Sequence, residues 1–415
     1  MSAALPALRI DGARLAGRIE ALAALGAIAG GGVCRLALTG EDRAGRDLVT
    51  GWMKELGLAV TVDAIGNVVG VRAGRAAGPA VMMGSHIDTV RTGGRFDGNL
   101  GVLAGLEVIQ ALADAGVVTQ RPLAVAFFTN EEGARFNPDM MGSLVYVGGL
   151  PLETALATVG IDGRSVGDCL REIGYAGTAP VGRPEVHAYL ELHVEQGPVL
   201  DQEGVTIGAV ESVQGISWTE FTVTGVSNHA GTTPMRLRHD AGYVACAIAQ
   251  RAREIAREFG GDQVATVGAI TLSPNLVNVI ANRAVFTVDL RNTDEARLQE
   301  AERQLHAFAA EVAKAEGVTL AHRSLARFEP VGFDPAVVGL VEETARALGH
   351  SVRRMPSGAG HDAQMLARAC PSGMVFVPSV GGISHNVREF TKQEDIEAGA
   401  NVLLHTVLRL ASDTH

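Results

Sequence analysis

Histidines and carboxylates lie in patterns that could hold metal ions, and the first such pattern is Gly84-Ser85-His86-Ile87-Asp88-Thr89. A histidine at a strand end can bind a cation through one ring nitrogen while a carboxylate two residues on fixes its tautomer through the other. The pattern predicts His86 as a metal ligand and Asp88 as the group that orients it. Asp97, in the following glycine-rich loop, is a carboxylate that can bridge two cations. Taken alone, these residues also fit ordinary hydrogen bonding in a loop.

The second pattern is Asn130-Glu131-Glu132-Gly133, directly after the apolar run 123–128. Adjacent side chains leave a strand in opposite directions, so one carboxylate can hold a metal while its neighbour faces the bound water. A divalent cation lowers the pKa of its water to about 7, which makes a carboxylate adequate as a proton acceptor. A solvated loop is the alternative for a lone pair of glutamates, but the buried strand predicted before it argues against that interpretation.

The third and fourth patterns contain His193 and His385. Alternation along a strand puts Glu191, His193 and Glu195 on one face, which is costly in a core unless they meet a cation or each other. His385 lies in the glycine-rich segment Gly381-Gly382-Ile383-Ser384-His385-Asn386. Either histidine alone could be structural. Together, two sets of imidazoles and carboxylates that share one aspartate are what a pair of borderline-soft divalent ions requires.

Short apolar runs that precede these patterns must position them. They predict strands over 80–84, 123–128, 188–194 and 373–377, with an amphipathic helix over 100–115. In open α/β sheets, ligands bind outside the carboxyl ends of the strands, and the polar residues gather at those ends here. The sequence therefore predicts an α/β fold with the site at one edge of its sheet.

The middle of the chain has a different pattern and predicts an inserted domain over 213–327. Its elements form a small β-α-β-β-α unit: strands at 218–223, 263–272 and 284–290 and helices at 241–259 and 295–316. Helices are predicted at 335–348 and 393–410, with a pattern like that of the segments before residue 213. We therefore expect a catalytic domain built from 1–212 and 328–415, with the metal-type residues on both sides of the insertion.

Length and composition bound the possible functions. A chain of 415 residues with 47% hydrophobic residues can bury two cores. A net charge of -11 argues against a nucleic-acid partner. The four cysteines lack a C-x-x-C spacing, so neither a disulfide framework nor a thiolate zinc site is expected. No signal peptide or membrane span is predicted, which makes a cytoplasmic enzyme the expectation.

The sequence resembles the di-metal aminoacylase and carboxypeptidase superfamily, and in it the hydantoinase/carbamoylase amidase branch. The resemblance covers nearly the whole chain. It rests on the motifs GSHIDTVRTGGRFDGNLGVLAG, FTNEEGARF, ELHVEQGPVLDQEG, GVSNHAGTTPM, PSGAGHDAQ and GGISHNVREF. It implies a zinc-peptidase-like catalytic domain with a mixed central sheet flanked by helices, and an inserted α+β lid and dimerisation domain through which a homodimer would form.

The resemblance also implies two divalent ions, with zinc first and manganese, cobalt or nickel as alternatives. Carried over by motif, His86, Asp97 and His193 would bind one ion. Asp97, Glu132 and His385 would bind the other. Glu131 falls at the position of the general base.

Other residues are expected to contact the substrate. An imidazole at His229 could stabilise the oxyanion that develops on the attacked carbonyl. Arg291 ends a predicted strand, and its guanidinium fork suits the α-carboxylate of an amino acid. As alternatives, His229 could be a surface histidine and Arg291 part of a surface salt bridge. The remaining expected contacts are Asn278, Gln196, Gly360 and His361, with Asp362 as a weaker candidate.

The function hypothesis is hydrolysis of the N-carbamoyl C–N bond of N-carbamoyl-L-amino acids, giving the amino acid, carbon dioxide and ammonia. A bridging metal-bound hydroxide would attack, and Glu131 would move the proton. The alternatives within the same chemistry are hydrolysis of allantoate, of β-ureidopropionate or of N-acyl amino acids, because one methylene changes binding by only ~1–3 kcal/mol. A non-catalytic scaffold is the alternative from another class, and peptidase activity is disfavoured because the pockets of this branch suit small substrates.

Overall fold

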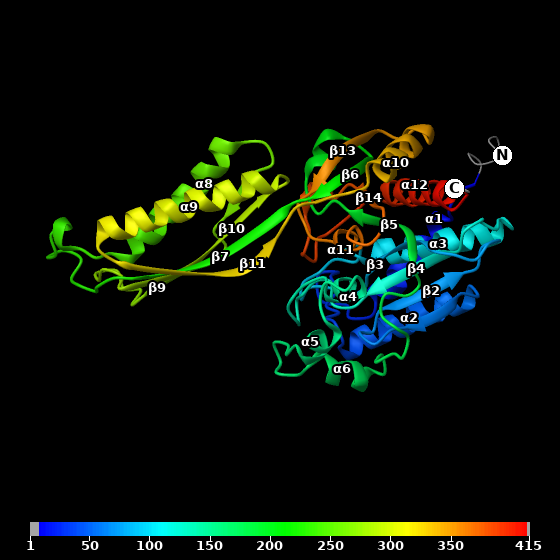
Figure 1. The fold of residues 1–415 in the computed structure, drawn as a ribbon, viewed down its shortest axis with the longest axis horizontal. Coiled ribbons are helices and arrows are strands. Elements are labelled where there is room, and N and C mark those ends of the chain that lie inside the picture. The colour runs from blue at the N-terminus through cyan, green and yellow to red at the C-terminus, as the bar shows by residue number, and fades with distance from the viewer. Residues whose placement is uncertain (1–7, 413–415) are drawn as a thin grey trace. The chain divides into compact units, whose positions relative to one another are not determined.

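The computed structural model describes residues 8–412. The chain divides into two compact units, of which unit 1 comprises Met1–Glu211 with Gly332–His415 and unit 2 comprises Ser212–Val331 (Figure 1). Unit 2 is thus an insertion between two halves of unit 1, and its limits lie close to the expected 213 and 327. Within the described residues, no helix is both long and apolar enough to cross a bilayer.

Unit 1 is built on a nine-stranded mixed sheet with the strand order β1-β2-β4-β3-β5-β14-β6-β12, and β13 pairs with β6. The central strands β4, β3, β5 and β14 are parallel to one another, whereas β2 and β6 flank them in antiparallel pairing. The strands are β1 (Ala59–Val62), β2 (Val68–Arg72), β3 (Ala80–His86), β4 (Leu123–Phe128), β5 (Val186–Val194), β6 (Ile207–Val213), β12 (Val331–Gly332), β13 (Val352–Ser357) and β14 (Ser372–Val377).

Helices cover the sheet because its central strands are apolar on both faces. Every residue of β3, β4 and β14 is buried, as parallel strands between helix layers require. Helix α3 packs on β3, β4 and β5, while α12 packs on β5 and β14. The helices are α1 (Gly12–Ala23), α2 (Gly40–Glu55), α3 (Asn99–Asp114), α4 (Met141–Tyr146), α5 (Leu152–Ala157), α6 (Val166–Ile173), α7 (Val199–Glu203), α10 (Pro335–Ala347), α11 (Asp362–Leu366) and α12 (Gln393–Ser412).

The parallel strands bring the four chemical patterns to one sheet edge. In register, His86 at the end of β3 lies beside Phe128 at the end of β4, and Val377 at the end of β14 lies beside Val194 at the end of β5. Because these strands run in the same direction, the segments that follow them leave from the same edge. The mixed α/β fold and the clustering at the carboxyl ends are confirmed.

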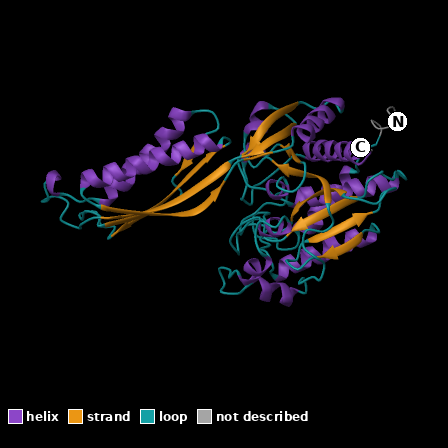
Figure 2. Cartoon of the chain, viewed as in Figure 1, coloured by secondary structure: helices purple, strands orange, loops and turns teal. Residues whose placement is uncertain are grey.

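Unit 2 is an antiparallel sheet with the order β11-β7-β10-β8, in which β9 also pairs with β10, and two long helices pack on the sheet (Figure 2). Its core is apolar and contains the stacked rings of Phe221 and Phe286, whose centroids are 5.3 Å apart. The elements are β7 (Gly215–Thr224), α8 (Ala241–Phe259), β8 (Val264–Thr266), β9 (Ile270–Ser273), β10 (Arg283–Asn292), α9 (Glu295–Glu316) and β11 (Thr319–Phe328).

Two expectations for this unit were wrong in detail. The single strand expected over 263–272 is two short strands, β8 and β9, separated at 267–269, where Gly268 lacks a side chain to pack. Strand β11 was not predicted, because its exposed positions carry Thr, His, Arg and Ser rather than an apolar alternation. Among the described strands it pairs with β7 alone, and charged residues are typical of such an edge strand.

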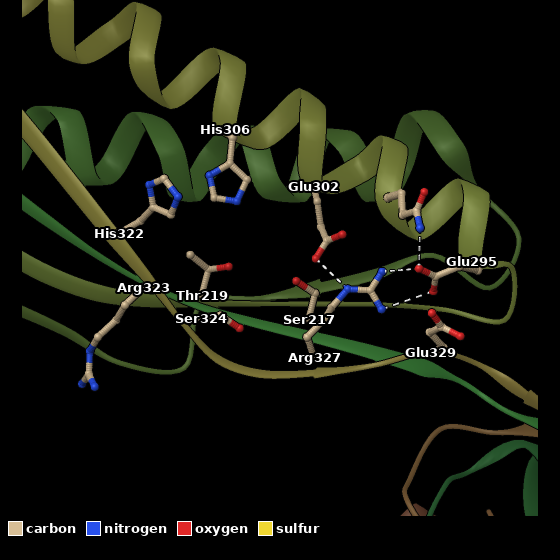
Figure 3. Close-up of a pocket in the computed structure, with 11 residues that line it drawn as sticks. Ser217, Thr219, Glu295, Glu302, His306, His322, Arg323, Ser324, Arg327 and Glu329 are labelled. Carbon is tan, nitrogen blue, oxygen red and sulfur yellow. Dashed lines mark hydrogen bonds and ion pairs between the residues drawn. The ribbon is translucent and has the colours of Figure 1, made fainter. Parts of the chain in front are cut away.

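Unit 2 also carries a polar cavity of about 700 Å³, lined by residues of α9, β7 and β11 (Figure 3). Arg327 forms ion pairs there with Glu295 at 2.6 Å and Glu302 at 3.0 Å. The rings of His306 and His322 lie 4.4 Å apart. None of the residues expected from the sequence to form the site lines this cavity.

Candidate metal centre

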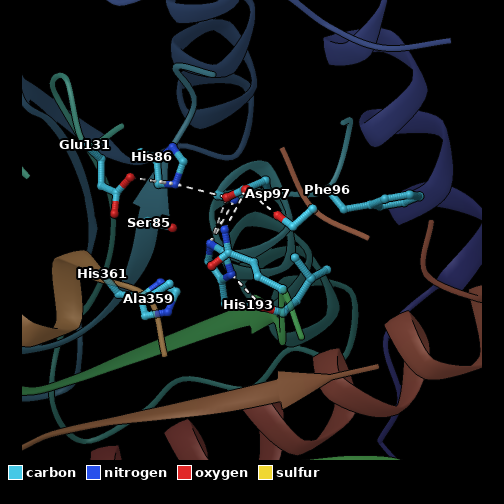
Figure 4. A network of polar contacts seen from close by, with 12 residues as sticks. Ser85, His86, Phe96, Asp97, Glu131, His193, Ala359 and His361 are labelled. Atoms are coloured by element: carbon cyan, nitrogen blue, oxygen red, sulfur yellow. Dashed lines mark hydrogen bonds and ion pairs between the residues drawn. The ribbon is translucent and has the colours of Figure 1, made fainter. Parts of the chain in front are cut away.

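Two sets of side chains lie at the sheet edge, and the donor atoms within each set lie close together. Asp97 belongs to both sets. In the first set, Oδ1 of Asp97 lies 3.6 Å from Nε2 of His86 and 3.3 Å from Nε2 of His193. All three side chains are buried (Figure 4). Two donors that are each about 2.1 Å from one tetrahedral ion are roughly 3.4 Å apart. The separations therefore fit a divalent cation.

The second set uses the other oxygen of Asp97. Its Oδ2 lies 3.4 Å from Nε2 of His385, which is 3.2 Å from Oε2 of Glu132. These separations fit the same tetrahedral edge. A carboxylate that presents one oxygen to each set is suited to bridge two cations, and the bridging role of Asp97 stays a prediction.

Backbone carbonyls orient the two buried histidines. Nδ1 of His86 lies 2.9 Å from the carbonyl oxygen of Asp88, and Nδ1 of His193 lies 2.8 Å from that of Val194. Because a carbonyl only accepts, each Nδ1 carries the proton and each Nε2 presents its lone pair. The N–H of Gly98 donates to Nε2 of His193 at 3.1 Å, in agreement with this tautomer.

The carboxylate of Asp88 has a different partner from the one expected. It accepts hydrogen bonds from the backbone N–H groups of Glu131 at 3.2 Å and Glu132 at 3.3 Å, whereas the Asp88 carbonyl contacts His86. The turn after β3 brings the carbonyl, rather than the side chain, next to the imidazole. Asp88 thus links the loop of the first histidine to the loop of the glutamate pair.

Glu131 lies beside the first set of donors. Its Oε2 is 3.3 Å from Nε2 of His86, and the residue is 7% exposed. Burial raises the pKa of Glu131 well above its usual range. The imidazole of His86 lowers this pKa, whereas the negative charges of Asp362, Glu132 and Asp97 raise it further. Glu132 meets His385 while its neighbour faces His86, so the two carboxylates separate as the strand-end argument predicted.

Three residues at the site have left-handed backbone conformations that side chains rarely adopt. They are Asn130 with φ 57°, Gln196 with φ 58° and His385 with φ 53°. The side chain of Asn130 donates to the carbonyls of Phe136 and Pro138, which holds its turn. Gln196, expected to contact substrate, here donates from Nε2 to Oδ2 of Asp97 at 2.8 Å.

The loop before α11 packs against the first set rather than presenting its histidine openly. His361 is 1% exposed, its Nε2 lies 2.8 Å from Oγ of Ser357, and its ring centroid is 4.5 Å from that of His193. Gly360 lies beside Met140, where a β-carbon would come within 2.9 Å of the methionine methyl group. The structure therefore gives His361 a packing role and leaves substrate contact at this loop as a proposal. Asp362 is likewise fully buried.

Glu191 is part of a third group of donors with His193 and His361, but its oxygens are already used. It accepts hydrogen bonds from Oγ of Ser85 at 2.6 Å and from the N–H of Ala363 at 2.8 Å. The polar face expected on β5 is thus satisfied partly by hydrogen bonds and partly by the donor set at Asp97.

The residues expected to contact substrate from unit 2 form two separate places. His229 and Asn278 are neighbours, because the N–H of Ala230 donates to the carbonyl of Asn278 at 2.9 Å. Arg291 lies at the other end of β10, which begins at Arg283. Eight residue steps of a strand span about 26 Å. Asn278 precedes Arg283 in the chain, so the length of β10 lies between these two places.

Sequence reasoning missed two buried arginines that hold the loops of the site. Arg35 is fully buried and donates to the carbonyl of Ile87 at 2.7 Å and to Asn99 at 2.8 Å. Ile87 follows His86 directly, and Asn99 lies two residues after Asp97. Arg46, also buried, donates to Thr129 just before the glutamate pair. Arginine between apolar residues in 33–37 was the available signal, but its partners are distant in sequence.

Comparisons with known proteins agree with this geometry. A sequence model of peptidase family M20/M25/M40 matches residues 82–409. The N-carbamoyl-L-amino-acid amidohydrolase of Rhizobium meliloti is 42% identical over 404 residues, 97% of each chain. The ureidoglycolate hydrolase of Arabidopsis thaliana is 33% identical over 98% of this chain and 88% of that protein. The crystal structure of an amidase of the hydantoinase/carbamoylase family from Burkholderia multivorans has a TM-score of 0.94 and 47% identity, covering 99% of this chain and 100% of the other.

The chain belongs to the M20/M25/M40 peptidase family and, within it, to the hydantoinase/carbamoylase amidase branch. It is an amidohydrolase of that branch, so the predicted family, fold class and hydrolase activity are confirmed. The family implies metal ions, and the two donor sets that share Asp97 fit them.

Metal content tests the two donor sets separately. Substituting His385→Ala should lower the content from two divalent ions per chain to about one, because only the second set loses a ligand. Elemental analysis after dialysis against limiting chelator measures this. Thr391→Ala, a buried residue that bonds to the Pro378 carbonyl, is the control and should retain both ions. A His385→Ala protein that still holds two ions would contradict the assignment.

Proposed function

We propose that the chain hydrolyses the N-carbamoyl group of N-carbamoyl-L-amino acids, releasing the free amino acid, carbon dioxide and ammonia. The names of full-length relatives support this substrate class. The observation that carries the proposed chemistry is the position of Glu131 beside two donor sets that share the carboxylate of Asp97. A cytoplasmic location remains part of the proposal.

Two divalent ions are part of the proposed site, zinc first and manganese, cobalt or nickel as alternatives. His86, Asp97 and His193 would hold one, and Asp97, Glu132 and His385 the other. When bound, such ions supply Lewis acidity and lower the pKa of water. The donor atoms are imidazole nitrogens and carboxylate oxygens, which all four metals accept.

Glu131 is proposed to move the proton of the reaction. Its carboxyl group lies 3.3 Å from the imidazole of His86, beside the first donor set, which makes it the candidate to take a proton from the attacking water. The same carboxyl group then protonates the nitrogen of the amino acid as the C–N bond breaks. The other product, carbamate, decomposes to carbon dioxide and ammonia. Asp88 keeps this base in place through the backbone of its loop.

His229 is proposed to stabilise the oxyanion on the carbamoyl carbon. Its Nδ1 accepts hydrogen bonds from the N–H groups of Gly231 at 3.1 Å and Thr232 at 3.2 Å. The neutral ring must then carry its proton on Nε2. An exposed Nε2–H can donate to a carbonyl oxygen, and the donation strengthens as negative charge develops there.

Arg291 is proposed to bind the substrate carboxylate. Its guanidinium is held by Asp289, with Nη2 2.9 Å from Oδ2, and lies 5.9 Å from the ring centroid of Trp218. A planar fork fixed in this way loses little conformational entropy when it binds a carboxylate. Gln196, Asn278 and the loop at Gly360 and His361 complete the proposed contacts.

We further propose that a homodimer completes each site through unit 2. Arg291 pairs with Ile216 near the start of β7, whereas Asn278 precedes Arg283, which lies about 26 Å from Arg291 along β10. If both groups contact a substrate, they must serve different copies of it. Arg291 would then act on the substrate of its own chain, and His229 and Asn278 on that of a second copy.

Ammonia release from a substrate panel tests the reaction. The metal-reconstituted enzyme should turn over N-carbamoyl-L-amino acids faster than their D-enantiomers, allantoate, β-ureidopropionate, ureidoglycolate and N-formyl or N-acetyl amino acids. Cleavage of the N-formyl and N-acetyl substrates is measured by the release of the amino acid. Preference for ureidoglycolate would group the chain with the plant ureidoglycolate hydrolases, and preference for allantoate would support the alternative substrate. Preference for an acetyl group would reject the carbamoyl assignment.

Replacing Glu131 separates the base from the ligands. Glu131→Gln should reduce kcat by a factor of about 10²–10⁴ and leave the metal content unchanged, because the amide keeps the shape but cannot carry the proton. Asp168→Asn, an exposed carboxylate on α6, is the control for loss of one charge. Retention of near-wild-type kcat in Glu131→Gln would remove it from the mechanism.

Mixed dimers test the contribution of a second copy. Glu131→Gln and His229→Ala proteins should each be nearly inactive, but their equal mixture should recover about a quarter of wild-type activity, because half of the dimers have one intact site. A mixture of Glu131→Gln with Arg291→Ala should recover none. If the first mixture also recovers none although mixed dimers are isolated, His229 acts within its own chain or not at all.

A further inference from the structure

Glu389 is a buried carboxylate in the loop that follows β14, four residues after His385. It is 5% exposed, and its Oε1 accepts hydrogen bonds from the backbone N–H groups of Phe96 at 3.1 Å and Asp97 at 3.2 Å. We propose that Glu389 is a positioning residue that holds the bridging carboxylate of Asp97 in place for both metal ions. The proposal rests on the two-ion site described above.

The two hydrogen bonds constrain the backbone from which the Asp97 side chain projects. One oxygen that accepts from two consecutive N–H groups orients both peptide planes that flank Phe96. The side chain of Asp97 must direct Oδ1 toward one donor set and Oδ2 toward the other. If a bridging ligand rotates, the donor geometry of both sets becomes worse at once. The backbone conformation of Asp97 therefore matters more than that of a residue that binds one ion.

The same contact joins the two loops that supply the second ion. Besides Glu389, Oγ of Ser384 lies 3.4 Å from Oδ2 of Asp97, and Oγ1 of Thr92 donates to the carbonyl of His385 at 3.4 Å. Those two contacts are long and partly exposed. The hydrogen bonds of Glu389 are buried, and they are the shorter contacts between the loop of His385 and the loop of Asp97.

Folding alone does not favour an acid at this position. Oε2 of Glu389 is buried and has no hydrogen-bond partner in the part of the chain that the structure describes. Burying a carboxylate that lacks a paired cation costs stability, and a neutral side chain of similar volume would avoid that cost. The carboxylate of Glu389 is therefore explained by its hydrogen bonds to the backbone at Asp97, the ligand that both sets share.

Gly94 makes room for this carboxylate. A β-carbon at Gly94 would lie 2.2 Å from Oε1 and 2.3 Å from Cδ of Glu389, so any side chain there must displace the glutamate. Its backbone is not in the left-handed region. Gly94→Ala therefore disturbs the contact without removing the acid, and gives a second and independent way to test it.

Metal affinity measured by chelator competition tests the proposal without reference to turnover. Glu389→Ala should weaken binding of Zn²⁺ at both sites by about 10- to 100-fold, as loss of groups that orient ligands does. Gly94→Ala should weaken both in the same direction. Glu389→Gln, which keeps one acceptor oxygen, should lie nearer to wild type than Glu389→Ala and serves if the alanine variant does not fold.

The matched control is Asp334→Ala. Asp334 also accepts two backbone N–H groups, those of Ala336 and Val337 at 2.9 and 3.0 Å, but caps α10 away from the donor sets. It should lower the melting temperature and leave Zn²⁺ affinity unchanged. Equal affinities in Glu389→Ala and Asp334→Ala would overturn the positioning role, as would loss confined to one site. A wild-type chain that binds no pair of ions would instead overturn the two-ion site itself.

Discussion

The whole site depends on one carboxylate that two sets of donors share. Burial by itself would raise the pKa of Asp97, but the nearby imidazoles of His193, His385 and His86 outweigh burial and hold the pKa well below its usual range. In return, Asp97 and Glu132 raise the pKa of His385 to about 10. Side chains arranged to favour positive charge this strongly at one point are equally arranged to favour a divalent cation there.

A recurring device keeps these groups in place: a buried carboxylate that accepts two backbone N–H groups of a neighbouring loop. Asp88 does so for Glu131 and Glu132, and Glu389 does so for the residues around Asp97. Glu195 likewise accepts two backbone N–H groups at 2.8 Å, those of Val199 and Leu200 at the start of α7. Ligand loops carry few apolar contacts of their own, so charge-assisted hydrogen bonds replace packing as the source of rigidity.

Unit 2 follows a different physical logic. Its apolar core, with Phe221 stacked on Phe286, lies between the sheet and the two helices, and the length of β10 separates Arg291 from Arg283. A strand of ten residues is longer than any amino-acid substrate. The separation of Arg291 from His229 is therefore a property of the sheet itself, and it leads to the proposal that two copies share their sites.

The sequence by itself determined the residue types of the site and the strands that end beside them, because apolar runs of five to seven residues and the motifs around His86, Glu131 and His385 are local patterns. It also determined the α/β class and the insertion. Only the tertiary structure decided which partner each group has. The carboxylate of Asp88 contacts the glutamate loop and not the imidazole, Arg35 and Glu389 hold loops far away in sequence, and Arg291 lies apart from Asn278. Each of these depends on register and on contacts between distant segments, which local periodicity does not encode.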